Sequence, residues 1–203
     1  MTNSTYLSCK DTAKLVRAAL KKNFPGVKFS VRSDNNSLRI EWMDGPLGKS
    51  VDAIVKNYEG GRFDGMIDMA YNVTSWLMPD GSAIVAHNPG SAGSRGVDEG
   101  CDNAKPHPDA KQVRFGANYV FTQRLISPTL KTAALARVCT DYVVPGDVYV
   151  KTSDYDGTGQ LSADPLITSG GCDDYLSSLV YRQLVNMGAT RQAATHTKPI
   201  RTL

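Results

Sequence analysis

Apolar residues near the start of the chain recur three and four positions apart, which places them along one face of a helix. Asp11 or Thr12 can cap this helix, and Pro25 with Gly26 should end it. Its outward face would carry lysines and an arginine, so we expect a basic amphipathic helix. The apolar set is Ala13, Val16, Ala19, Leu20 and Phe24.

Alternation of apolar and polar residues follows, as is typical of strands that are buried on one face. Residues 27–33 and 38–43 both alternate, and the Asp-Asn-Asn-Ser sequence between them favours a turn. Pro46 then suits the start of a second one-sided helix, which Gly60 and Gly61 should end. The first third of the chain therefore predicts helix, strand, strand, helix.

The middle of the chain predicts mainly strands. Residues 71–78 alternate, residues 79–81 read Pro-Asp-Gly and favour a turn, and residues 83–86 complete a hairpin. A further strand is expected over residues 112–123, with Gly116 as a bulge. Its aromatic and apolar residues suggest that it pairs with the other strands.

The last third returns to helix. Ser127 is a good N-cap, and Pro128 is a good first residue of a helix. A short strand over residues 148–151 precedes a last amphipathic helix, which Gly188 should end. Residues 189–203 have no apolar periodicity, so we expect a disordered tail there.

These elements predict an α+β fold, with antiparallel hairpins flanked by amphipathic helices in a single compact domain over residues 1–188. With 203 residues, 41% of them hydrophobic, the chain is long enough to bury a core of its own. It has no run of about 20 apolar residues and no apolar signal segment at its start, so we expect a soluble protein without membrane contact. Its four cysteines form no Cys-x-x-Cys pair, which argues against a disulfide framework and a zinc finger.

The net charge of +3 is modest, but the charges are unevenly distributed. Basic residues dominate residues 10–39, and aspartates dominate residues 141–174. Runs of charge are usually solvated surface, but a basic helix beside a basic hairpin also suits the phosphates of nucleic acid. A positive net charge argues against an acidic mimic of DNA. The candidate nucleic-acid-binding residues are Lys14, Arg17, Lys21, Lys22, Lys28, Arg32 and Arg39.

Two segments suggest metal or catalytic chemistry, and neither is complete. Residues 154–160 begin like a calcium-binding loop, but Pro165 occupies the place of the closing glutamate. His87 and His107 could meet a nearby aspartate as a general base and its orienting group, but His107 lies between two prolines and suits a rigid turn. We therefore predict no catalytic residues, no metal site and no cofactor.

The long irregular stretch of residues 88–111 is the first candidate for a binding loop, because loops beyond about 12–15 residues are usually functional or disordered. Its glycines flank Arg95 and could present N–H groups to a phosphate, but their spacing matches neither a P-loop nor a dinucleotide fingerprint. Aromatic residues upstream belong either to the core or to a binding surface. The candidate protein-binding residues are Tyr58, Phe63, Asp64, Trp76, Arg95 and His107.

Four blocks of sequence carry a resemblance to a known family. The blocks are residues 11–32, 58–66, 79–81 and 105–109. In order and spacing they resemble the twenty-ninth of the domains associated with the large polyvalent proteins of bacteriophages and conjugative elements. The resemblance covers residues 5–125 and leaves residues 126–188 as a helical completion. It implies a protein carried by phages or plasmids, in a group suspected of protecting incoming DNA against host defence, and it implies no known reaction.

Three functional hypotheses follow. The first is a non-enzymatic counter-defence protein in the bacterial cytoplasm, which binds and blocks a host defence protein through the long loop and exposed aromatic residues. The second is an accessory protein that binds nucleic acid through its basic N-terminal helix. The third is an unrecognised enzyme. We favour the first.

Overall fold

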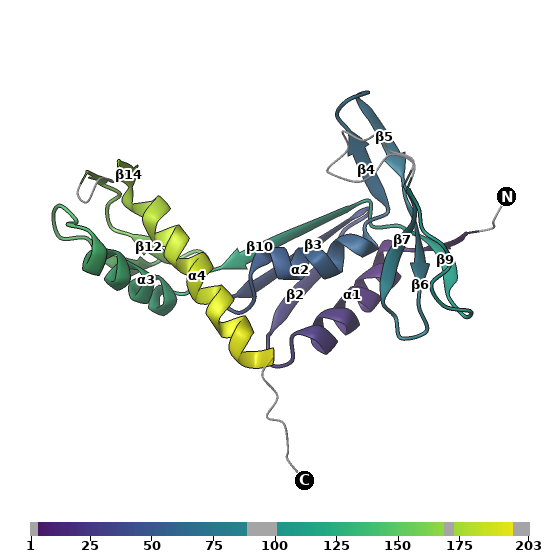
Figure 1. Cartoon of the computed structure of the whole chain (residues 1–203), viewed down its shortest axis with the longest axis horizontal. Coiled ribbons are helices and arrows are strands. Elements are labelled where there is room, and N and C mark those ends of the chain that lie inside the picture. The colour runs from purple at the N-terminus through teal and green to yellow at the C-terminus, as the bar shows by residue number, and fades with distance from the viewer. Residues whose placement is uncertain (1–3, 89–100, 169–172, 197–203) are drawn as a thin grey trace, which may run out of the picture. The chain divides into compact units, whose positions relative to one another are not determined.

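The computed structural model describes residues 4–88, 101–168 and 173–196, beginning with a short strand and a capped helix (Figure 1). Helix α1 (Cys9–Asn23) begins after Ser8, whose hydroxyl accepts a hydrogen bond from the Asp11 amide at 3.2 Å. The cap is therefore Ser8 and neither Asp11 nor Thr12, because Thr12 is buried inside the first turn and donates to the Ser8 carbonyl at 2.9 Å.

Contacts divide the described chain into two compact units, each with its own core. The first unit comprises residues 1–42 and 48–123, and the second comprises residues 43–47 and 124–203. Helices and antiparallel hairpins are mixed along the chain, so the predicted α+β class is confirmed. A single domain over residues 1–188 stays a prediction.

The first unit contains most of the described strands. In chain order its elements are β1 (Thr5–Leu7), α1, β2 (Phe29–Ser33), β3 (Ser37–Met43), α2 (Gly48–Val55), the 3-10 helix η1 (Lys56–Tyr58), β4 (Gly61–Asp64), β5 (Met69–Asn72), β6 (Thr74–Leu77), β7 (Ala83–Asn88), β8 (Cys101–Asp102), β9 (Lys111–Phe115) and β10 (Tyr119–Leu125). The last residues of β3 and β10 belong to the second unit. They form a five-stranded sheet in the order β1-β9-β6-β7-β8, a three-stranded sheet in the order β10-β3-β2, and the pair β4-β5.

Two predicted hairpins are confirmed. Strands β2 and β3 pair with Val31 opposite Ile40, and strands β6 and β7 pair with Trp76 opposite Ile84. The apolar stripe of α1 packs with the inward side chains of β3 in one core, which also contains the apolar residues of α2. The predicted order of helix, strand, strand, helix is therefore correct for the start of the chain, after the short strand β1.

The prediction of one strand over residues 112–123 is wrong. Strand β9 ends at Phe115 and β10 begins at Tyr119, and the two strands belong to different sheets. Gly116 stands where the chain leaves the first sheet: its amide donates to the Leu7 carbonyl at 2.7 Å, and a Cβ there would lie 2.8 Å from the same oxygen. Gly116 therefore permits a close crossing of two backbone segments instead of forming a bulge.

The strand expected over residues 71–78 is interrupted at Val73. The Val73 side chain is buried, and its amide donates to the Gly60 carbonyl at 3.0 Å. Strand β5 ends before it and pairs with β4, while β6 begins after it and pairs with β7 and β9. One alternating run of sequence therefore contributes to two sheets.

The segment between α2 and β4 fixes strand β10 against the core of the first unit. The Glu59 carboxylate is almost fully buried and accepts hydrogen bonds from the Val120 amide at 2.9 Å and from Lys56 Nζ at 3.1 Å. The same ammonium donates to the Val120 carbonyl at 2.6 Å. Next in sequence, the Gly60 amide donates to the Ala117 carbonyl at 2.8 Å. Residues 56–60 therefore position β10 and the base of β4 together.

The second unit packs helix α3 (Pro128–Asp141) against helix α4 (Leu176–His196). As predicted, Ser127 caps α3, and Pro128 is its first residue. The strand pairs β11 (Val150–Thr152) with β12 (Gly159–Leu161) and β13 (Leu166–Ile167) with β14 (Asp174–Tyr175) complete the unit. Across the described residues, no helix has the length and apolar character that crossing a bilayer requires.

The predicted end of the last helix at Gly188 is wrong, because α4 continues to His196. A glycine inside a helix costs only about 1 kcal/mol relative to alanine, and the residues that follow it include good helix formers. The remainder of the predicted disordered tail, residues 197–203, lies outside the described residues.

Residues 43–47 lie early in the sequence but belong to the second unit. Asp44 adopts a left-handed conformation with φ of 54°, and its amide donates to the Leu125 carbonyl at 2.7 Å. Its carboxylate accepts a hydrogen bond from the Ser127 amide at 2.9 Å. The turn at Asp44 is thus held by the residues that lead into α3.

Glycines at the two ends of β4 provide a matched test of this packing. A methyl group at Gly60 would overlap the Phe115 carbonyl, whereas one at Gly65 would meet open space. We expect Gly60→Ala to destabilise the first unit by about 1–3 kcal/mol or more, and Gly65→Ala to change it little. Both tryptophans, Trp42 and Trp76, lie in the first unit, so their fluorescence during urea unfolding measures that unit alone. Equal midpoints for the two variants would contradict the close approach at Gly60.

Candidate functional site

Tyr58, a candidate contact residue, belongs to the core. Its side chain is 1% exposed, and its ring lies 5.3 Å from that of Phe115 between centroids. The hydroxyl donates to the Gly81 carbonyl at 2.8 Å, which joins η1 to the turn between β6 and β7. Burial, with a smaller contribution from the charge of Asp80, raises the pKa of Tyr58 to about 12. Tyr58 therefore stabilises the core of the first unit and is not available for contact with a partner.

The other candidate contact residues are placed differently from one another. Asp64 is fully buried, and its carboxylate accepts a hydrogen bond from the Met66 amide at 2.9 Å within the turn that follows β4. Trp76 is partly exposed and donates from Nε1 to the Asn103 carbonyl at 2.9 Å. Phe63 is 48% exposed on β4, and Arg95 lies outside the described residues. The structure thus leaves Phe63 as the aromatic candidate with the most exposed ring.

The residues of the histidine and calcium interpretations lie in a turn, on strand β7 and in the loop between β11 and β12. His107 is exposed in a turn, where its Nδ1 accepts from the Asp109 amide at 3.1 Å, and His87 lies opposite Asp102 on strand β7. Asp156, in the supposed calcium loop, instead accepts from the hydroxyl and the amide of Thr158. Among the described residues, no group of three or more histidines, cysteines and acids could hold a metal ion.

Six of the seven candidate nucleic-acid-binding residues lie either on α1 or on the strands that it covers. The basic residues of α1 project from the helix that covers one face of β2 and β3. Arg32 and Arg39 occupy the alternate positions of these strands and therefore point away from α1. Lys28 is exposed just before β2. The lysines of α1 and the two strand arginines therefore project from different elements, and a nucleic-acid-binding role for the seven residues stays a prediction.

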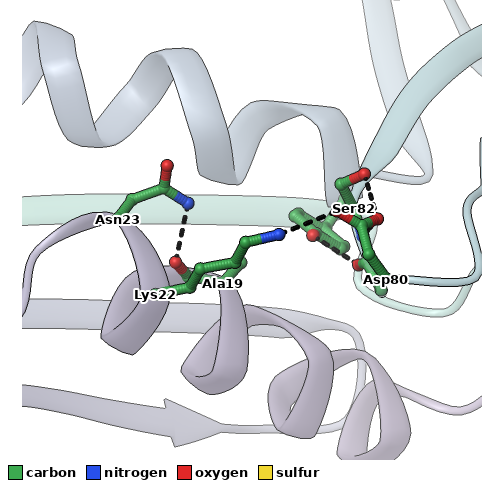
Figure 2. Close-up of polar contacts among 7 residues, drawn as sticks. Ala19, Lys22, Asn23, Asp80 and Ser82 are labelled. Carbon is green, nitrogen blue, oxygen red and sulfur yellow. Dashed lines mark hydrogen bonds and ion pairs between the residues drawn. The ribbon is translucent and has the colours of Figure 1, made fainter.

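Several cations of α1 already have partners in the first unit. Lys22 Nζ lies 2.8 Å from the Asp80 carboxylate, which also accepts from the Ser82 hydroxyl at 2.6 Å (Figure 2). These contacts, led by Lys22, hold the pKa of Asp80 well below its usual range. Lys14 pairs with Asp11 at 2.8 Å, and Arg17 donates to the Val31 carbonyl at 2.6 Å. The helix presents less free positive charge than its sequence suggests.

A hairpin with an exposed apolar tip is the most prominent surface of the first unit. Strands β4 and β5 project beyond β6 and β7 (Figure 1). We call its large exposed apolar side chains the hairpin tip: Phe63, Met66, Ile67 and Met69. The sequence drew attention to the first two of these residues, but it did not reveal the hairpin, because the strand pattern was assigned to residues 71–78 as one run.

The face of β10-β3-β2 that points away from α1 carries a second set of exposed residues. Tyr119 and Phe121 lie on β10 with their ring centroids 6.3 Å apart, and Arg32 and Arg39 lie opposite each other on β2 and β3. We call these four residues the outer face. The sequence indicates both arginines as candidate binding residues, but it predicts only that the two aromatic residues belong to a paired strand. Tyr119 and Phe121 are exposed because Val120 between them points into the core. The local sequence pattern does not show which face of β10 is buried.

Comparison with known protein families identifies the first unit. The family model described as large polyvalent protein associated domain 29 matches residues 7–127. No curated protein and no solved structure matches the chain.

The buried hydroxyl of Tyr58 predicts a pH dependence of stability. A group whose pKa is higher in the folded than in the unfolded chain stabilises fully below the unfolded value, and that contribution is lost as pH rises through the folded value. Stability of the first unit should therefore fall between about pH 10, the ordinary tyrosine value, and about pH 12. Tyr58→Phe should cost about 1 kcal/mol at neutral pH through the lost hydrogen bond, and should show a shallower alkaline fall. Urea unfolding followed by tryptophan fluorescence measures both effects, and parallel pH curves for the two proteins would refute the assignment.

Proposed function

The chain belongs to the large polyvalent protein associated domain 29 family, and from that membership we propose that it is a counter-defence protein that binds and blocks a host protein. The family associates the chain with phages and mobile genetic elements. The specific action is our inference from the surface of the first unit.

The hairpin tip is the observation that carries this proposal. Met66 is 73% exposed, Ile67 56% and Met69 51%, in neighbouring positions of one hairpin. Exposed apolar groups in one place mark interaction sites, because their contact with water costs free energy that a partner removes. Methionine is flexible and polarisable, which suits an adaptable contact with another protein surface.

The base of the hairpin is held by hydrogen bonds and by close approach of backbone segments. The Gly60 amide and carbonyl bond to Ala117 and Val73, and Gly61 approaches Asn118 closely. Asp64 closes the turn by accepting from the Met66 amide, so the tip is shaped before any partner arrives. A preformed contact loses less conformational entropy on binding, which favours affinity.

Blocking a host protein requires occupation of a surface and no chemical step. An interface of standard size covers about 800 Å² on each partner, of which a few buried apolar or aromatic anchors supply most of the affinity. The hairpin tip offers such anchors, and the neighbouring body of the first unit offers the surrounding area. A host defence protein in the bacterial cytoplasm is the partner that this function requires.

Photo-crosslinking tests the proposal. A crosslinking amino acid in place of Met66 should capture a specific protein from a bacterial host extract, and the same residue in place of Tyr155, which is 97% exposed in the second unit, should not. The triple variant Phe63→Ser, Met66→Ser, Ile67→Ser should bind the captured protein at least about tenfold more weakly, because anchor residues contribute more than 1 kcal/mol each.

The control is the variant Tyr155→Ser, Tyr181→Ser, which removes exposed aromatic rings from the second unit and should bind normally. Tryptophan fluorescence of the triple variant checks that the first unit remains folded. A triple variant that is folded and binds the captured protein as tightly as the unaltered chain does would refute the hairpin tip as the interface.

A further inference from the structure

The outer face is defined by the alternation of side chains along three strands. On β3, Leu38, Ile40 and Trp42 are buried in the core beneath α1 and α2, so Arg39 between them points to the opposite side. On β10, Val120 belongs to the same core, and the Thr122 hydroxyl donates to Asp52 of α2 at 2.7 Å. The residues that alternate with these two, Tyr119 and Phe121, therefore face the same side as Arg39.

The two aromatic rings form an exposed pair. Tyr119 is 49% exposed and Phe121 is 55% exposed, and their planes differ by 17°. Both rings thus present area to solvent from fixed neighbouring positions on one strand. Their centroid separation of 6.3 Å is nearly twice the spacing of about 3.4 Å between stacked bases of one DNA strand, so the two rings are not in direct face-to-face contact.

Arginines lie on both sides of this aromatic pair. A surface depression of about 170 Å³ is lined by Arg32, Arg39 and the turn between β2 and β3. The Asn36 carbonyl of that turn accepts from the Tyr119 amide at 3.3 Å, and Tyr119 in turn lines a second depression of about 220 Å³ with Arg62 and Tyr71. Aromatic rings and guanidinium groups therefore follow one another across the first unit.

Two acids lie on the same path. Glu41 is 3.8 Å from the Arg32 guanidinium, and Asp34 lines the first depression, where its carboxylate accepts from the Asn35 amide. Arg39 and Arg62 have no ion-pair partner within the described ranges 4–88, 101–168 and 173–196. Positive charge therefore exceeds negative charge on this path, which suits an anionic ligand.

We propose that the outer face, together with Arg62 of β4, binds single-stranded nucleic acid, with bases stacked on Tyr119 and Phe121 and phosphates paired with Arg32, Arg39 and Arg62. Stacking on aromatic side chains and charge pairing with a backbone are the two interactions by which single strands are held without regard to sequence. Bases of a duplex are already stacked on one another and offer no free face to a ring, so the aromatic pair favours a single strand. This surface is distinct from the hairpin tip, and neither proposal depends on the other.

Fluorescence anisotropy with a labelled oligothymidylate, and with a duplex that contains the same strand, tests the proposal on the whole 203-residue chain. The single strand should bind more tightly than the duplex. Tyr119→Ala and Phe121→Ala should each weaken binding roughly fivefold to hundredfold, because each removes one stacking platform. Arg39→Ala should reduce the slope of log affinity against log salt concentration by about 0.7, as expected for one lost phosphate contact.

A variant that gains affinity separates binding from misfolding. Glu41→Gln removes the acid beside Arg32, so it should raise affinity roughly twofold or more at low salt. Lys14→Ala and Lys21→Ala, on the helix that covers the opposite side of the sheet, should change affinity little. Tryptophan fluorescence confirms that each variant is folded.

Several results would overturn the proposal. Absence of binding to the single strand, equal affinity for single strand and duplex, or loss of binding in the Lys14 and Lys21 variants would each do so. A Tyr119→Ala, Phe121→Ala variant that keeps its affinity for oligothymidylate but loses a protein partner would show that the outer face is a protein interface instead.

Discussion

The buried carboxylate of Glu59 is the contact on which both exposed surfaces depend. By accepting from the Val120 amide and from Lys56, it fixes the side of β10 that faces the core, and therefore the side on which Tyr119 and Phe121 emerge. Hydrogen bonds to a charged group contribute about 1.5–3 kcal/mol, and loss of one partner would leave a buried donor unsatisfied. The residue that follows Glu59 begins the base of the projecting hairpin. One short segment thus sets the position of both surfaces.

This dependence explains which parts of the fold could be predicted from the sequence. The apolar stripes of α1 and α3, the cap of α3 and the hairpin β2-β3 are determined by residues within a few positions of one another, so local pattern was sufficient. The cap of α1 was not predicted correctly, because Ser8 caps the helix instead of Asp11 or Thr12. The separation of β9 from β10 arises where Gly116 crosses Leu7, and the division of residues 71–78 arises where Val73 bonds to Gly60. Those contacts join distant parts of the chain, and periodicity carries no signal for them.

The candidate site was predictable to a similar extent. Aromatic residues near paired glycines drew attention to residues 58–66, yet Tyr58 lies inside the core and Phe63 is exposed, because Gly60 between them packs against the Phe115 carbonyl. The basic residues were recognised by composition, but composition does not reveal which side of a sheet a residue occupies. Arg39 is separated from Lys14 in space because strand residues alternate between faces while α1 covers only one of them.

The turn at Asp44 has a consequence for how this family module is delimited. The matched region, residues 7–127, extends four residues past the end of the first unit at residue 123, and those residues include Leu125 and Ser127, which hold Asp44. A module cut at the unit boundary would leave a left-handed aspartate inside it with no anchor, whereas one that ends at Ser127 retains both bonds. When this domain is joined to unrelated sequences in other proteins, residues 124–127 should therefore be retained with it, whichever sequence follows them.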